Sequence, residues 1–490
     1  MRILLVKPKG VLATIRGLER FQRLEPLELG YLAAALPPHH QVRALDLRLA
    51  RYPRRALLRA VGELQPELVG FSGYSHESGA IKAMAQLLKQ LVPTVSVVVG
   101  GHHATVAPQD YNVPGIDYVV RGEGCGPFRL LVAALEQHES PAGIDNLLLT
   151  GEFWDQEAAA RWPRFPDPAT LPVPRRDLWD RRHYYSVWVS EQPRRWQVLF
   201  PQVAMVRTSY GCRMKCSFCV VPYLCGGEHR PRPVAAVADE IAALPQQHVY
   251  FADDENFIDE RFAGELAEAL AQRGVRKRYF AWTRATTVLR SPEILKRWGE
   301  IGLDGAFLGF EFSSDDELKE VRKGGTVASN ERAHETLRRL GIACHAAFMV
   351  RPEYTAEQFE RLARYLRDMP PAQCSFTVCT PSPGTPDWQA MQPRIWVEDP
   401  YRLYDCMHPL TPTTLPLPEF GRRFASLLAT AAVKNPLRTQ RRPVRPWELA
   451  RVLLAEHRYE AAFRYLYRDY PPALASSRGE GRAASACPWG

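Results

Sequence analysis

The sequence lacks any run of about 18 or more apolar residues, the length that a helix needs to cross a bilayer. Its start, Met1-Arg2-Ile3-Leu4-Leu5-Val6, also lacks the long apolar segment and the cleavage site of a signal peptide. We therefore expect a cytoplasmic protein, at most peripheral to the inner face of the membrane. Thiols are reduced in that compartment, so the ten cysteines are expected to be metal ligands or core residues rather than disulfides.

The composition also lacks any bias typical of a disordered, fibrous or disulfide-dense protein, and no internal repeat is present. Hydrophobic residues make up 46% of the chain and charged residues 24%, which is ordinary for globular domains. The 490 residues suffice for two to four domains at roughly 100–200 residues each. The net charge of +9 permits an anionic partner without requiring one.

Residues 1–150 alternate short apolar runs with segments of helical periodicity. Continuous valine-rich runs such as Val97–Val99 are typical of parallel strands buried on both faces. The expected strands are Arg2–Val6, Val42–Leu45, Leu68–Phe71, Val95–Val99 and Tyr118–Val120. Five such units predict an α/β domain with a doubly wound sheet of the flavodoxin or Rossmann type, which binds its ligand at the carboxyl ends of the strands.

The rest of the chain divides into four segments. Residues 151–200 are rich in proline and arginine and are expected to form a linker that crosses the surface of a neighbouring domain. Six further βα units over 201–390 predict a partial (β/α)6 barrel of the TIM type, with ligand sites at the carboxyl ends of its strands. Residues 391–473 are expected to form a basic helical region, and 474–490 a flexible tail.

Three cysteines with the spacing C-x3-C-x2-C follow the first expected barrel strand: Cys212, Cys216 and Cys219. Three thiolates on one loop can hold three irons of a [4Fe–4S] cube and leave the fourth iron open to a small molecule. A structural zinc site would require a fourth ligand. Cys225 could supply it, but the five-residue gap containing Pro222 makes a compact zinc site unfavourable.

This triplet is the hallmark of the radical S-adenosylmethionine (SAM) superfamily, which the rest of 201–390 also resembles. The resemblance implies that the open iron binds SAM, and that one electron cleaves SAM to methionine and a 5′-deoxyadenosyl radical. Cys212, Cys216 and Cys219 would then be the catalytic cluster ligands. Phe218 resembles the family residue that lies against the adenine.

The resemblance also implies that SAM is bound at the ends of the following strands. Asp253 and Asp254 stand where the family has the Gly-Gly-Glu motif that binds the SAM ammonium, although Asp254 could instead cap a helix. Arg284 and Glu311 end the next two strands and suit SAM, although either could form a structural salt bridge. Cys379–Thr385 resembles the family's TPxPGT loop.

Glycine-rich segments follow consecutive strands of the N-terminal domain, where they let a large flat ligand approach the backbone. No G-x-G-x-x-G follows the first strand, which disfavours a dinucleotide. Beside the cysteine triplet, these segments resemble the cobalamin-binding half of B12-dependent radical SAM enzymes. The resemblance implies cobalamin contacts from Ser72, Gly73, Tyr74, His76, Gly100, Gly101, His102, Glu123 and Gly124.

The D-x-H-x-x-G motif that places a histidine on cobalt is missing, because the loop over residues 7–15 contains neither Asp nor His. We therefore expect cobalamin without a protein histidine on the metal. His76 and His102 could contact corrin amides or the substrate, or be ordinary loop histidines.

Methylcobalamin together with an adenosyl radical implies methylation of an unactivated carbon. The chain resembles hopanoid C-3 methylases in Glu25–Leu29, in 226–232 and in His408–Pro416, which implies a small hydrophobic substrate, together with an electron donor such as flavodoxin or ferredoxin. Non-methylating chemistry such as ring closure is the alternative. Only Cys125 lies in the N-terminal domain, which argues against the tRNA methylthiotransferases and their second cysteine triplet.

The C-terminal region is strongly basic, with nine Lys/Arg against three Glu between Lys434 and Arg468. Trp447–Tyr467 has the pattern of an amphipathic helix, which could lie on an anionic bilayer. A basic helix packed on the barrel is the alternative. The same charges would also suit nucleic acid, a partner that we do not expect.

Overall fold

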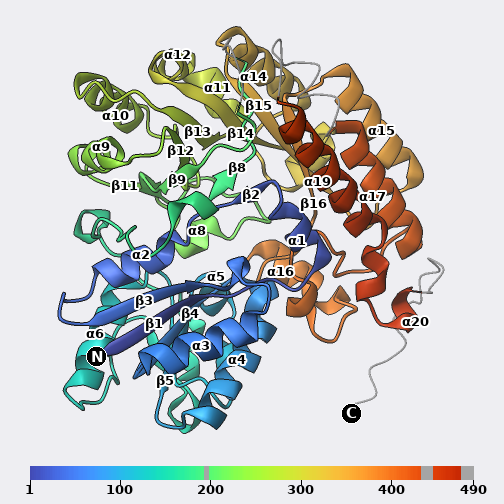
Figure 1. The fold of residues 1–490 in the computed structure, drawn as a ribbon. Coiled ribbons are helices and arrows are strands. Elements are labelled where there is room, and N and C mark those ends of the chain that lie inside the picture. Colours follow the sequence, from blue (N-terminus) through green and yellow to red (C-terminus); the bar gives the residue numbers. More distant parts are fainter. Residues whose placement is uncertain (192–197, 432–444, 476–490) are drawn as a thin grey trace.

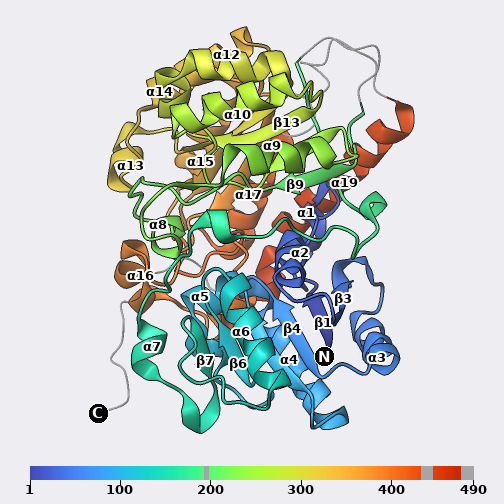
Figure 2. The ribbon, with the colours of Figure 1, turned by 90° about the vertical axis from the view of Figure 1, so that its left-hand side faces the viewer.

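The structure is a computed structural model, and it describes residues 1–191, 198–431 and 445–475. Two six-stranded sheets lie one above the other (Figure 1), the N-terminal sheet in blue to teal and the second sheet in green to orange. A view turned by 90° shows the same two layers, with α1 (Ala13–Leu18) and α2 (Leu27–Ala34) lying between them (Figure 2).

The N-terminal sheet has the order β3-β1-β4-β5-β6-β7, parallel except for the antiparallel last pair. Its strands are β1 Arg2–Lys7, β3 Gln41–Asp46, β4 Leu68–Ser72, β5 Ser96–Gly100, β6 Tyr118–Val120 and β7 Leu147–Leu149. When the five parallel strands are numbered by their order along the chain, their order across the sheet is 2-1-3-4-5, as in flavodoxin-like folds. The predicted doubly wound sheet is therefore confirmed.

Helices cover both faces of this sheet, which explains why its strands are apolar throughout. On β1, Leu4 and Val6 pack against α3 (Pro53–Leu64) and α4 (Ser78–Leu91). Ile3 and Leu5 pack on the other face, against α2 and α6 (Cys125–Glu136). Short elements that were not predicted include β7, α1, and α5 (His102–Val106), which begins directly after Gly101 at φ +94°.

The second sheet is wholly parallel and has the order β16-β15-β14-β13-β12-β9, as predicted for a partial (β/α)6 barrel. Its strands are β9 Val203–Val206, β12 His248–Phe251, β13 Arg278–Thr283, β14 Leu303–Glu311, β15 Ala343–Val350 and β16 Gln373–Val378. Its longer helices are α9 Val234–Ala243, α10 Glu260–Gln272, α12 Pro292–Ile301, α14 Val327–Arg339 and α15 Ala356–Asp368. Short helices α11 (Ala285–Arg290) and α13 (Asp315–Glu320) add to these.

The segment between the two sheets has little regular structure and is tied to both. Arg176 is buried, and its guanidinium donates to Glu25 and to Glu240 of α9. Trp188 packs in the barrel interior, and its Nε1 donates to Asp304 at 2.9 Å. These buried contacts join the segment to the barrel rather than giving it a core of its own.

The described C-terminal region consists mainly of α17 (Leu417–Ala431) and α19 (Pro446–Arg464). Helix α19 packs on α17 and on α1, where Gly17 leaves room for the ring of Tyr459. The guanidinium of Arg451 lies 3.8 Å from the ring centre of Phe200. The predicted basic helix therefore exists and packs on the body of the protein. No helix in the described ranges is long and apolar enough to span a membrane.

Candidate active site

The three cysteines lie on one loop that follows β9. Cys216 is buried, and Cys212 and Cys219 are half-buried. Gly211, at φ +82°, begins the loop at a position where a Cβ would lie 2.2 Å from the Glu228 carbonyl oxygen, so no other residue fits. Burial raises the pKa of the Cys219 thiol to about 12. A metal that binds here must therefore displace protons, as thiolate ligation requires.

Arg284 and Glu311, the two charged residues predicted at the ends of the barrel strands, belong to one chain of contacts beside the cysteines. The Arg284 guanidinium donates to Cys216 Sγ at 3.4 Å and to the Lys323 carbonyl oxygen. The Lys323 ammonium donates to Glu311 Oε1 at 2.5 Å. Glu311 adopts φ +62°, which is unusual for a residue other than glycine and is typical of functional sites.

The two aspartates after β12 hold the cysteine loop in place. Asp253 is buried, and its carboxylate accepts from the backbone and hydroxyl groups of Thr208 and Ser209. Asp254 accepts from the Gly211 amide at 2.9 Å. The following helix α10 is capped by Asp259 and not by Asp254. Asp253 and Asp254 thus position the loop, and a SAM contact from either one stays a prediction.

The sequence analysis missed Glu255, the third acid of the same run. Its Oε1 accepts from the Thr283 hydroxyl at 2.7 Å, and its buried Oε2 has no partner among the described residues. Burial raises the pKa of Glu255 to about 7. A buried carboxylate oxygen without a partner suits a cationic ligand group. The three consecutive acids after a strand were the signal that could have found it.

A cavity of about 490 Å³ opens at the carboxyl ends of β1, β4, β5 and β6. Of the nine residues predicted to contact cobalamin, eight line it: Ser72, Gly73, Tyr74, Gly100, Gly101, His102, Glu123 and Gly124. His76 does not line it. The His76 ring packs instead against Gly10 and stacks on Tyr74 with ring centres 6.1 Å apart.

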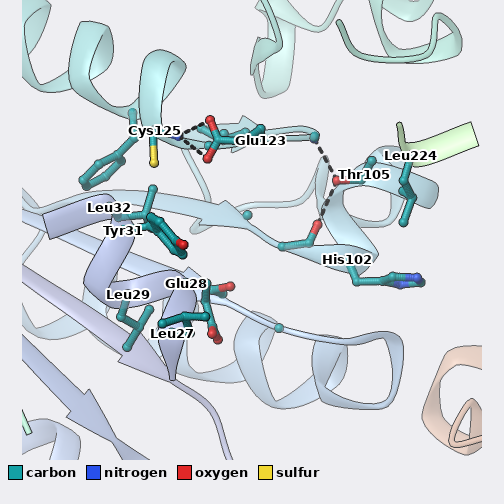
Figure 3. A pocket seen from close by; sticks show the side chains of 18 of the residues that line it. Leu27, Glu28, Leu29, Tyr31, Leu32, His102, Thr105, Glu123, Cys125 and Leu224 are labelled. Atoms are coloured by element: carbon teal, nitrogen blue, oxygen red, sulfur yellow. Dashed lines mark hydrogen bonds between the residues drawn. The ribbon is translucent and has the colours of Figure 1, made fainter. Parts of the chain in front are cut away.

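The cavity has an apolar floor and polar loops at its edge (Figure 3). Leu5, Val98 and Phe128 are among the floor residues. Figure 3 shows Thr105 joining two strand-end loops, because its hydroxyl donates to the Gly101 carbonyl and accepts from the Gly122 amide, both at 2.9 Å.

Charges around the cavity are compensated or removed. Lys7 lies under the Tyr74 ring, 4.6 Å from its centre, with Glu28 at 3.3 Å and Glu77 at 3.8 Å. Burial lowers the pKa of His102 to about 4, so this imidazole is neutral at physiological pH. A large ligand of low net charge fits this environment.

The barrel forms the opposite wall of the cavity, and it does so next to the cysteine loop. Arg207 and Tyr210 come directly before Cys212 and line the cavity, as do Leu224 of the short helix α8 (Val221–Leu224) and the buried Cys225. In Figure 3, Leu224 approaches from the barrel side, near His102. The cavity and the cysteine loop are therefore adjacent sites.

The residues present fit the three predicted groups. Three thiols on a buried loop, with one sulfur hydrogen-bonded by an arginine, suit an iron–sulfur cluster. The unpaired Glu255 oxygen suits the SAM ammonium. Glycines at the strand ends, above an apolar floor, suit a flat macrocycle such as cobalamin. Phe218 is half-buried on the barrel core beside the cysteines.

Comparison with known families gives two matches on this chain. Residues 13–132 match the B12 binding domain, and residues 206–366 match the radical SAM superfamily. The matched segments contain the cavity edge and the cysteine loop, respectively.

Two curated relatives have different activities. The hopanoid C-3 methylase of Methylococcus capsulatus is 29% identical over 426 residues, 86% of this chain and 78% of that protein. The anaerobic magnesium-protoporphyrin IX monomethyl ester cyclase of Rubrivivax gelatinosus is 28% identical over 363 residues, 71% of this chain and 62% of its own length.

Solved structures share the fold. The radical SAM methyltransferase TsrM from Kitasatospora setae, with cobalamin and a [4Fe–4S] cluster bound, has a TM-score of 0.60 and 22% identity, covering 79% of this chain and 76% of its own. The cobalamin-dependent radical SAM enzyme OxsB has a TM-score of 0.67 and 15% identity, covering 95% and 72%.

Proposed function

We propose that the chain is a cobalamin-dependent radical SAM enzyme of the methyltransferase type, and that it methylates an unactivated carbon of a hydrophobic substrate of the hopanoid class. One observation carries the proposal most: the cavity of the B12-binding domain is walled by residues that flank the cysteine loop. The two cofactors would therefore face a shared space, as transfer of a methyl group to a substrate radical requires.

The bound groups would supply an adenosyl radical, from SAM at the cluster, and a methyl group, from cobalamin. The protein's own residues hold and orient them. Cys212, Cys216 and Cys219 would hold the cluster, with Arg284 donating to Cys216. Glu255 would accept from the SAM ammonium through its unpaired oxygen.

The strand-end glycines and Glu123 would hold the corrin, with neutral His102 at the cavity edge. His102 is the one histidine that lines the cavity among the described residues, so a histidine ligand to cobalt would have to come from this residue. Because the motif for such a ligand is missing from the loop after β1, we propose that the cobalt has no histidine ligand.

The substrate proposal rests on the methylase relative and on an apolar cavity, and it extends to partners. A one-electron donor such as flavodoxin or ferredoxin would reduce the cluster. A hydrophobic substrate would be drawn from the membrane, so we also propose a peripheral membrane contact.

A deletion strain tests the proposed reaction. Lipid and pigment extracts of the mutant should lack a compound that the parent contains and accumulate its counterpart, lighter by one methyl group. An accumulated compound that differs by ring closure would instead favour the cyclase chemistry of the Rubrivivax relative.

A further inference from the structure

A second cavity, of about 710 Å³, lies on the N-terminal domain and shares no lining residue with the proposed cobalamin site. It is bounded by the loop after β1, by α1, by the start of α3 and by one face of α4. Its volume lies within the range of about 300–1,000 Å³ that is common for ligand sites. We call it the basic groove, because its charged residues are Lys9, Arg16, Arg51 and Arg54.

The basic groove has no carboxylate in its lining, and none of its four cations forms an ion pair within the part of the chain that the structure describes. Lys9 donates only to the Ala50 carbonyl oxygen, at 2.8 Å. By contrast, Lys82 and Lys89 elsewhere on α4 are paired with aspartates at 2.9 Å and 2.7 Å. Four cations without a salt bridge around one concavity create a positive potential that favours an anion.

The floor of the basic groove is formed by α4, which presents apolar side chains there beside Gln86 and Gln90. Helix α4 already buries Ile81 and Leu88 in the domain core. A second apolar stripe, Ala80, Met84 and Leu87, lies beside it, half-exposed in the groove. Solvent-facing helix positions are usually polar. This face therefore suits a ligand with an apolar part as well as a negative charge.

Apolar side chains also project from the rim. Val11 is 60% exposed, Tyr52 54% and Leu49 38%. The Arg51 guanidinium lies 5.3 Å from the centre of the Tyr52 ring. Exposed apolar and aromatic residues interleaved with arginine are typical of segments that lie at a bilayer surface.

We propose that the basic groove binds the phosphate and the adjoining acyl chain of an anionic phospholipid, and so docks the enzyme on a bilayer. An acidic carrier protein would match the cations but would leave the apolar floor uncovered. The inference deepens the proposed function, because a hydrophobic substrate resides in the same bilayer, but its test does not depend on the reaction.

We propose the groove, rather than α19, as the main membrane contact. On α19, Arg451 lies over the rings of Tyr185 and Phe200, and Arg464 pairs with Glu460. Arg464 thus has a carboxylate partner and Arg451 lies between two rings, whereas Arg16, Arg51 and Arg54 of the groove have no carboxylate partner among the described residues.

Vesicle sedimentation of the full-length, cofactor-loaded protein tests the proposal. The parent should pellet at low salt with vesicles containing phosphatidylglycerol and not with pure phosphatidylcholine. Replacing both Arg51→Gln and Arg54→Gln should lower the partition coefficient about thirty-fold, as expected for the loss of two cations at an anionic surface. Leu87→Gln should also weaken binding. Lys296→Gln with Arg297→Gln, on exposed positions of α12 at the far end of the molecule, is the matched control.

Three results would overturn the proposal. The first is that the double variant, Arg51→Gln with Arg54→Gln, pellets with anionic vesicles as well as the parent does. Leu87→Gln could be without effect while inorganic phosphate competes, which would reveal a simple anion site. An acidic flavodoxin could bind in a groove-dependent way with no binding to vesicles. SAM cleavage should be normal in all variants, so a failure here is distinct from a failure of the proposed reaction.

Discussion

At the scale of single residues, the chemistry-bearing side chains were predictable where the residue type alone determines the chemistry. The spacing of Cys212, Cys216 and Cys219 identified the cluster loop, and the structure places all three together. Glu255 was missed because its importance lies in an unpaired buried oxygen, which depends on the neighbouring strand. His76 was assigned to the cavity because it follows a glycine-rich loop, yet its ring turns toward Gly10.

Changing any one of Cys212, Cys216 and Cys219 to Ala should abolish the reconstituted cluster and all SAM cleavage, because an iron without its thiolate leaves the cube incomplete. Iron and sulfide content with the visible absorption band measures this. Cys225→Ala is the control: it removes a buried thiol from the cavity wall and should retain the cluster. Normal 5′-deoxyadenosine production by Cys216→Ala would contradict the assignment.

Arg284→Met should leave the cluster assembled but shift its reduction potential to more negative values. The guanidinium donates to Cys216 Sγ, and a cation beside the sulfur stabilises the reduced cluster, which carries one more negative charge than the oxidised cluster. Removing this cation therefore makes the cluster harder to reduce. The expected shift is on the order of 60 mV, about 1.4 kcal/mol for one electron. Arg290→Met, at the end of the short helix α11 that follows Arg284, should leave the potential unchanged, because Arg290 pairs with Glu260. Equal potentials in both variants would show that Arg284 has no electronic role.

At the scale of elements, alternating apolar runs and helical periodicity were enough to predict every barrel strand and all five parallel strands of the N-terminal sheet, because strands buried on both faces are recognisable from composition. Helices of six residues or fewer, such as α1 and α5, escaped prediction because so few residues carry no helical periodicity. Helix α5 depends on Gly101 at φ +94°, a backbone feature.

The glycines at the carboxyl ends of the N-terminal strands allow a test of the proposed cobalamin site. A Cβ at Gly100 would meet nothing closer than 3.6 Å, so Gly100→Leu should fold, while its side chain takes cavity space. We expect binding of hydroxocobalamin, measured as cobalamin retained after gel filtration, to fall at least ten-fold. Gly62→Leu on α3, where a Cβ meets nothing within 4 Å and which lies outside the cavity lining, should bind normally. Full retention by Gly100→Leu would place cobalamin elsewhere.

At the scale of the whole molecule, contacts between distant segments were not predictable, because they pair residues with no sequence relation. His408 is the clearest case. The sequence analysis used it only as part of a family-like stretch, but it is buried between Asp405 and Asp469 at 3.0 and 3.2 Å. Asp405 also accepts from Thr14 of α1, so this cluster fastens the N-terminal domain to the C-terminal region.

This cluster predicts a pH dependence of stability. The two aspartates raise the pKa of His408 from 6.5 to about 9. Because the folded protein binds this proton more tightly than the unfolded chain, the stabilisation is complete below pH 6.5 and is lost as the pH rises to about 9. The loss amounts to at most about 3 kcal/mol.

Urea unfolding between pH 6 and 10 measures the effect. Asp469→Asn removes one of the two charges, so its stability should already fall at lower pH. Glu460→Gln, at a half-buried position whose carboxylate pairs with Arg464, should follow the parent curve. Parallel curves for the parent and Asp469→Asn would show that His408 is neutral in the folded protein.

The central claim is that the two cofactor sites work on one substrate. The most direct test incubates the reconstituted enzyme with a reductant, SAM carrying a deuterated methyl group, and a hopanoid extract, with and without cobalamin. With cobalamin, we predict both 5′-deoxyadenosine and S-adenosylhomocysteine, and a lipid product heavier by one labelled methyl group. Without cobalamin, we predict neither S-adenosylhomocysteine nor the methylated lipid. Labelled product that forms equally well without cobalamin, or 5′-deoxyadenosine as the sole SAM product with cobalamin and substrate present, would contradict the account.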